Sequence, residues 1–156
     1  MNKEELVKRL PHGAPFIFIE KVLAIDKGQR IKALKTVTAG EEVINAGDGA
    51  PQQAFPFVLL VESMAQASGL VLEAEEIEMA FLTMINDARH IKPAMAGDIL
   101  IIESELTKKF PPLYVFRASI SVDGEIIAMA EITLTSITRA ATRAGAGRGT
   151  TGTMRR

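Results

Sequence analysis

Glu62 is the residue of this sequence whose type and position most suggest chemistry. It interrupts residues 55–73, FPFVLLVESMAQASGLVLE, in which most other side chains are apolar. A carboxylate in apolar surroundings is costly unless it is paired, hydrogen-bonded or protonated, and perturbed carboxyl groups are frequent at functional sites. Gln66 would lie over the same face one helical turn later. Glu62 is therefore a candidate catalytic residue, unless its side chain simply reaches solvent at a helix edge.

The rest of the chain offers few other reactive groups. His12 and His90 are the only histidines, so any imidazole chemistry must use one of them. The chain contains no cysteine, which excludes disulfides, thiolate metal sites and a cysteine nucleophile. Ser63 and Ser68 have no histidine at helical spacing and are not credible nucleophiles. The sequence has no cluster of metal ligands, and neither a metal nor another cofactor is expected.

Residues 55–73 are predicted to form a central helix. Pro56 suits its first position, and the apolar residues leave almost no polar face, so other elements must cover this helix. A short helix is expected before Pro11. Strands are expected at 16–26, 30–37, 79–86 (buried), 99–108, 113–122 and 125–137, with a tight hairpin at Asp123-Gly124. We predict an α+β domain, 1–137, whose antiparallel sheet wraps around the central helix in the hot-dog arrangement.

Composition narrows the class of protein. A chain of 156 residues that is 47% hydrophobic fits one globular domain. Residues 138–156 are rich in Ala, Gly, Thr and Arg and are expected to be a disordered tail. Five arginines lie in this tail, and without them 13 basic residues stand against 19 acids, a net charge of −6. This acidic balance argues against a nucleic-acid partner. No signal peptide or membrane span is visible, so a cytoplasmic protein is expected.

Four segments, in this order, resemble the β-hydroxyacyl-acyl-carrier-protein dehydratases of fatty-acid biosynthesis. They are Leu10-Pro11-His12 with Pro15-Phe16; Pro56, Val58-Leu59, Glu62 and Met64-Ala65-Gln66; the run INDARHIKPAMAGD at 85–98; and Val122-Asp123-Gly124 with 128–131. The resemblance covers roughly residues 8 to 137 and implies the hot-dog fold. It also implies an acyl thioester substrate on acyl carrier protein or coenzyme A, and a homodimer with active sites at the subunit interface.

The resemblance further implies catalytic roles. In that family a histidine removes the proton alpha to the thioester, and a carboxylic acid assists departure of the β-hydroxyl group. Backbone N–H groups at the N-terminus of the central helix polarise the thioester carbonyl. Glu62 falls on the carboxylate position, and Asp48 falls on the histidine position, with the two residues contributed by different subunits. Phe57 replaces a glycine, and its ring is expected to narrow the approach to the carbonyl. The implied substrate-binding residues are Pro56, Phe57, Val58, Gln66 and His90.

Several assignments stay open. Asp48 is either a weaker base or a turn residue before Gly49. His12 is expected to make a structural hydrogen bond, and His90 is either solvent-facing on its strand or close to the tunnel mouth. With Asp48 at the histidine position, three functions fit. The resemblance over the whole domain favours the first, an active or impaired dehydratase acting as a hydro-lyase. The alternatives are a thioesterase in which Glu62 or Asp48 activates water, and a non-catalytic acyl-binding subunit that partners an active relative.

Overall fold

The computed structural model describes residue 5 and residues 8–39, 54–72 and 77–138. Helix α2 spans Phe57–Val71. The strands are β1 (Lys21–Asp26), β2 (Arg30–Thr36), β3 (Ala54–Phe55), β4 (Ile77–His90), β5 (Ala94–Met95), β6 (Ile99–Phe110), β7 (Leu113–Val122) and β8 (Glu125–Thr138). No helix within these ranges is long and apolar enough to cross a membrane.

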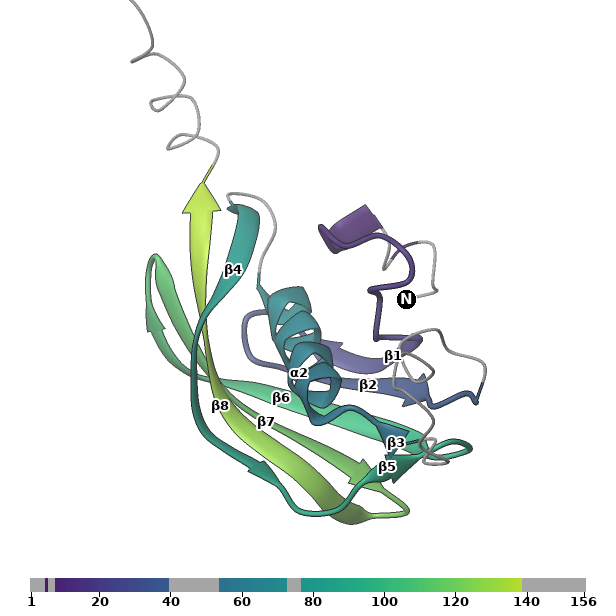
Figure 1. Cartoon of the computed structure of the whole chain (residues 1–156). Helices are drawn as coiled ribbons and strands as arrows, with labels where there is room; N and C mark the ends of the chain where they lie inside the picture. The colour runs from purple at the N-terminus through teal and green to yellow at the C-terminus, as the bar shows by residue number, and fades with distance from the viewer. Residues whose placement is uncertain (1–4, 6–7, 40–53, 73–76, 139–156) are drawn as a thin grey trace, which may run out of the picture.

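Six strands form one antiparallel sheet in the order β1-β2-β6-β7-β8-β4. The sheet bends around α2, which lies across its concave face (Figure 1). Strands β3 and β5 form a separate two-stranded sheet, and β3 leads directly into α2. The predicted α+β hot-dog architecture is therefore confirmed.

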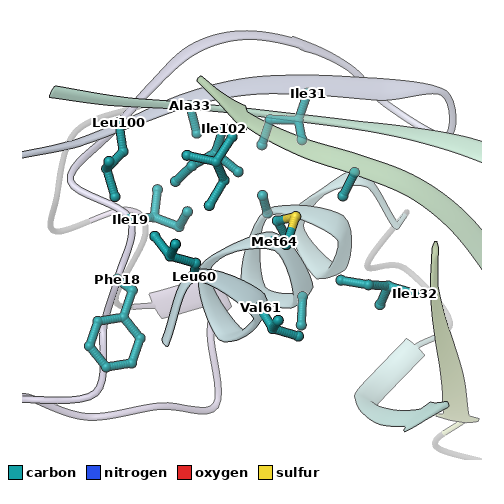
Figure 2. Packing of buried hydrophobic residues seen from close by; sticks show 14 of the residues in the cluster. Phe18, Ile19, Ile31, Ala33, Leu60, Val61, Met64, Leu100, Ile102 and Ile132 are labelled. Carbon is teal, nitrogen blue, oxygen red and sulfur yellow. The ribbon is translucent and has the colours of Figure 1, made fainter. Parts of the chain in front are cut away.

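The hydrophobic core lies between α2 and the inner face of the sheet. Leu60 and Met64 of α2 are fully buried, and they point toward the strands (Figure 2). The strand residues in this cluster include Ile31, Ala33, Leu100, Ile102 and Ile132. Burying one large apolar side chain stabilises the fold by about 1.5–3 kcal/mol relative to leaving it exposed. This packing fixes the rotation of α2, and with it the direction in which Glu62 points.

The hairpin predicted at Asp123-Gly124 is confirmed. These two residues have φ angles of 49° and 84°. Two positive φ angles in a two-residue connection match the right-handed twist of the flanking strands, and glycine adopts such angles without steric cost. Strands β6, β7 and β8 follow the predicted segments closely, with one or two residues added at the ends of β6 and β8.

The predicted strand at 16–26 is wrong in its first half. Strand β1 begins at Lys21, and residues 17–20 have no regular secondary structure. Phe18 and Ile19 are nevertheless buried. The backbone N–H of Phe18 donates to the side chain of Gln66 on α2, instead of to a neighbouring strand. Phe18 is therefore held against the central helix instead of within a strand.

The boundaries of the central helix also differ from the prediction. Phe55 does not belong to the helix, because it pairs with Ala94 in the small sheet. Pro56 is the residue that precedes the first helical turn, and it has an extended ψ of 139°. The helix ends at Val71, because Leu72 has extended backbone angles.

The predicted strand at 79–86 is confirmed, but the prediction that it is buried is wrong. The segment belongs to β4, but residues 81–90 are all exposed. The reason is its place in the sheet, because β4 is the last strand and pairs only with β8 among the described strands. The exposed apolar side chains of β4 are Met79, Phe81, Leu82, Met84 and Ile85.

Two predicted regions lie outside the described residues. One is the segment 40–53, which contains Asp48, and the other is the tail from 139 onward. Thr138, which the sequence assigned to the tail, is the last residue of β8.

Candidate active site

One face of α2 is turned away from the sheet. Val58, Glu62 and Gly69 recur on this face at helical spacing and are among the less buried residues of the helix. The side chain of Glu62 is 29% exposed, so it is partly buried and still accessible to a bound molecule. Hydrogen bonds tie the N-terminal segment 12–18 to the same face. Glu62 therefore lies between the central helix and a loop that is about fifty residues earlier in the chain.

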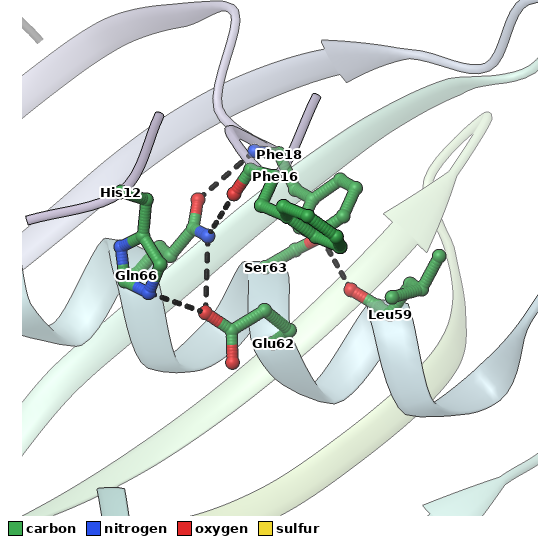
Figure 3. Close-up of polar contacts among 7 residues, drawn as sticks. All are labelled: His12, Phe16, Phe18, Leu59, Glu62, Ser63 and Gln66. Atoms are coloured by element: carbon green, nitrogen blue, oxygen red, sulfur yellow. Dashed lines mark hydrogen bonds and ion pairs between the residues drawn. The ribbon is translucent and has the colours of Figure 1, made fainter. Parts of the chain in front are cut away.

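Gln66 connects Glu62 to that loop (Figure 3). Its Nε2 donates to Oε1 of Glu62 at 3.0 Å and to the carbonyl oxygen of Phe16 at 2.7 Å. Its Oε1 accepts the backbone N–H of Phe18 at 2.9 Å. The Nε2 atom of His12 lies 3.2 Å from the same Oε1 of Glu62. The prediction that Gln66 lies one turn from Glu62 on the same face is confirmed.

Two cavities meet at Glu62 and His12, which line both of them. The larger has a volume of about 750 Å³ and lies between the N-terminal segment, α2 and the first half of β4. The smaller has a volume of about 330 Å³ and is lined mainly by apolar side chains. Those side chains are Phe16, Phe18, Val58, Leu59, Val61, Leu82 and Ile85. A carboxyl group at such a junction can meet both the polar and the apolar part of a bound molecule.

The N-terminus of α2 offers hydrogen-bond donors one turn before Glu62. The backbone N–H groups of Leu59 and Leu60 reach the carbonyl oxygen of Pro56, at 2.9 and 3.2 Å. The N–H groups of Phe57 and Val58 come before these in the chain and have no acceptor within the helix. The first turn contains no acidic residue. These donors lie at the positive end of the helix dipole, where they can stabilise developing negative charge on an oxygen.

Phe57 and His90 lie together, although 33 positions separate them in the chain. Their rings stack with centroids 4.8 Å apart and an interplanar angle of 13°. His90 is exposed at the end of β4, and Phe57 is half-buried. The structure therefore places two of the predicted substrate-binding residues beside each other at the start of the helix.

The serines take no part in this site as nucleophiles. Ser63 donates to the carbonyl oxygen of Leu59 at 2.7 Å. Ser68 is fully buried and bonds to Ser104 and to the carbonyl oxygen of Met64. Within the described ranges no group of three acidic or histidine residues is arranged to hold a metal ion.

His12 is the site residue whose partner sequence reasoning missed. The sequence predicted a structural hydrogen bond for His12, but not that it would be to Glu62. The two residues are fifty positions apart and belong to a loop and a helix. No local pattern links such residues, and covariation among related sequences is the signal that could have done so.

The fold and site together define a hot-dog domain with a carboxyl group between two cavities, beside a helix N-terminus. Residues 10–131 match the FabA-like domain family. The chain is 34% identical over 142 residues to the 3-hydroxyacyl-acyl-carrier-protein dehydratase FabZ of Thiobacillus denitrificans, covering 86% of this chain and 97% of that protein. It is 38% identical over 136 residues to the FabZ dehydratase of Bacillus cereus, covering 85% and 94%. The chain therefore belongs to the FabZ-type dehydratase family.

Solved structures agree on the fold. The dehydratase heterocomplex ApeI:P from Xenorhabdus doucetiae matches with a TM-score of 0.73 and 20% identity, over 92% of this chain and 97% of that chain. A hypothetical thioesterase with coenzyme A from Streptococcus pneumoniae matches with a TM-score of 0.61 and 15% identity, over 76% and 85%. The hot-dog fold is thus common to dehydratase and thioesterase structures, and fold alone does not choose between them.

Proposed function

We propose that this protein is a hydro-lyase that interconverts β-hydroxyacyl and enoyl thioesters carried by acyl carrier protein or coenzyme A. The observation that carries the proposal is the position of Glu62. Gln66 holds its side chain by a hydrogen bond at the junction of two cavities. The FabZ names of its relatives favour this chemistry over others available to the fold.

Dehydration requires two proton transfers and a stabilised carbonyl oxygen. The Cα–H bond breaks and its proton goes to a base, which we assign to Asp48. The electron pair forms the C=C bond while the Cβ–O bond breaks, and the carboxylic acid of Glu62 protonates the departing oxygen as water. The thioester oxygen, which gains negative charge, accepts from N–H groups at the N-terminus of α2. Asp48 lies outside the described residues, and its role rests on the family resemblance.

Pro56, Val58 and His90 complete the proposed substrate site together with Phe57 and Gln66. Val58 lines the smaller cavity, whose apolar character suits an acyl chain. Pro56 sets the direction of the first helical turn, where the thioester carbonyl would bind.

A homodimer is part of the proposal. Strand β4 is an edge strand that carries five large exposed apolar side chains. Edge strands and large exposed apolar patches are common sites of association. A second copy of the chain that covers this edge would also bring its own position 48 toward Glu62, as the family resemblance implies.

The thioesterase alternative uses the same groups. Hydrolysis needs a base that activates water and donors for the oxyanion, but no removal of an α-proton. It is favoured by Asp48 in the place of a histidine, and by the presence of thioesterases among proteins of this fold.

A paired assay separates these functions. Purified protein is given crotonyl-CoA or β-hydroxybutyryl-CoA, and enoyl absorbance and free thiol are followed together. We expect enoyl change without thiol release. Glu62→Gln should reduce the rate by at least about 100-fold, because general acid–base groups contribute on this scale. Glu103→Gln is the matched control, because Glu103 forms an exposed ion pair with Lys32 at 3.2 Å.

Other outcomes of this assay would place the protein in a different functional class. Thiol release that depends on Glu62 would place it among thioesterases. Absence of both signals, with a rise in melting temperature on adding a longer acyl thioester, would indicate an acyl-binding subunit. Unchanged turnover in Glu62→Gln would contradict both catalytic proposals.

A further inference from the structure

Two side-chain nitrogens lie close to one oxygen of Glu62, one from Gln66 and one from His12. Gln66 Nε2 lies 3.0 Å from Oε1, and His12 Nε2 lies 3.2 Å from the same atom (Figure 3). The hydrogen bonds and ion pairs found for Glu62 in the described part of the chain all involve Oε1. The two oxygens of this carboxyl group therefore stand in different environments.

We propose that His12 is a positioning residue that, together with Gln66, fixes which oxygen of Glu62 exchanges protons with substrate. A carboxyl oxygen has two lone-pair sites. When both sites of Oε1 accept N–H groups, a proton on the carboxyl group must reside on Oε2. Oε2 is then the acid atom in dehydration and the base atom in hydration. This inference rests on the proposed function, because it assigns a role within the same site.

The protonation of His12 supports this arrangement. Its Nδ1 atom is buried and has no hydrogen-bond partner among the described residues. A proton on Nδ1 would be a buried donor without an acceptor there, whereas a bare lone pair at that atom is tolerated more readily. The favoured tautomer carries its proton on Nε2, the atom that faces Glu62. Nε2 is then the atom through which His12 donates an N–H group toward Glu62.

The surroundings of His12 distinguish this role from a purely structural one. A histidine that only fastened a loop would be expected to bond to backbone groups of the helix. Instead, the polar contact that the structure gives the His12 side chain is to Glu62. The loop is attached to the helix by Gln66, which hydrogen-bonds to the backbone of Phe16 and Phe18. His12 also lines both cavities beside Glu62, so its ring borders the space that substrate would occupy.

Two substitutions at the same position test the proposal in the crotonyl-CoA hydration assay. His12→Ala removes the N–H donor, and we expect kcat to fall about 10- to 100-fold, since misplacing a catalytic group costs rate on this scale. KM should change much less. His12→Gln places an amide N–H near the position of Nε2, and it should restore kcat to within a few fold of the parent protein. Lys32→Ala is the control, because Lys32 forms an ion pair of equal length with Glu103, and neither residue lines the two cavities.

The results have distinct meanings. An unchanged kcat in His12→Ala would overturn the inference while leaving Glu62 as the catalytic residue. Equal losses in His12→Ala and His12→Gln would also overturn it, because they would assign the function to the titrating imidazole instead of its N–H group. Turnover that survives Glu62→Gln would contradict the proposed function itself.

A second measurement does not depend on turnover. Nitrogen-15 NMR of histidine-labelled protein reports the tautomer of each ring, and His12→Gln identifies the His12 signals. We expect the His12 ring to carry a proton on Nε2 and none on Nδ1, and its Nε2 signal to move in Glu62→Gln. A proton on Nδ1, or an Nε2 chemical shift that is the same in Glu62→Gln as in the parent protein, would overturn the inference even if the protein were inactive.

Discussion

At the scale of single residues, Phe57 is the side chain that most alters the carbonyl end of the proposed site. Its ring stacks on His90 at the first turn of α2, beside the N–H groups that would face the thioester. The family resemblance implies a glycine at this position. A bulky ring at this point competes for space with any group that approaches those donors.

We expect Phe57→Gly to raise kcat/KM for β-hydroxyacyl thioesters, and Asp48→His combined with it to raise kcat/KM further. A gain of about tenfold corresponds to about 1.4 kcal/mol of transition-state stabilisation. Steady-state rates with β-hydroxybutyryl-CoA provide the measurement. Phe57→Leu serves as the control, because it keeps a bulky side chain at this position. A double variant no faster than the parent would show that these two positions do not limit turnover.

At the scale of elements, Gln66 joins α2 to the segment 16–18. It is 2% exposed and its amide satisfies the backbone N–H of Phe18 and the carbonyl oxygen of Phe16. Both groups would need other partners without it, because the segment at 16–18 is not part of a strand. The same side chain holds Glu62, so loop attachment and site geometry depend on one residue.

We expect Gln66→Leu to lower the free energy of unfolding by about 1–3 kcal/mol, because it leaves a buried N–H without a partner. Urea unfolding at neutral pH measures this change. Ser63→Ala is the comparison, since the hydroxyl of Ser63 bonds only to the carbonyl oxygen of Leu59 within the same helix among the contacts described. Equal effects of the two substitutions would mean that Gln66 does not hold the loop.

At the scale of the whole molecule, the exposed edge strand β4 is the surface through which we propose that two copies of the chain associate. Leu82 and Ile85 of β4 line the smaller cavity, so the edge and the proposed site share a surface. A partner on this edge would therefore help to enclose the substrate site. Activity and association are expected to be lost together.

We expect the protein to be a dimer in sedimentation at micromolar concentration and Met84→Asp to shift it toward monomer. Met84 is 55% exposed on β4, and a charge there would have to be desolvated at the interface. Phe110→Asp is the control, because Phe110 is 66% exposed at the end of β6, away from this edge. A parent protein that is monomeric, or a dimer unaffected by Met84→Asp, would contradict the proposed interface.

The elements with local signals could be predicted from the sequence alone. The strands from 99 to 138 and their Asp123-Gly124 hairpin follow from alternation and turn chemistry within a few residues. The central helix and the candidacy of Glu62 follow from one carboxylate in an apolar run. Family resemblance to the dehydratases also came from short motifs, and the comparisons confirmed it.

Contacts between residues far apart in the sequence became visible only in the three-dimensional structure. The apolar residues at 79–86 give the same sequence pattern whether the strand lies inside a sheet or at its edge. The order of the strands in the sheet shows that β4 lies at the edge and is exposed. The contact of His12 with Glu62 and the stack of Phe57 on His90 join residues more than thirty positions apart. Such contacts depend on how helix, loop and sheet pack together, and no propensity or spacing within one segment encodes that packing.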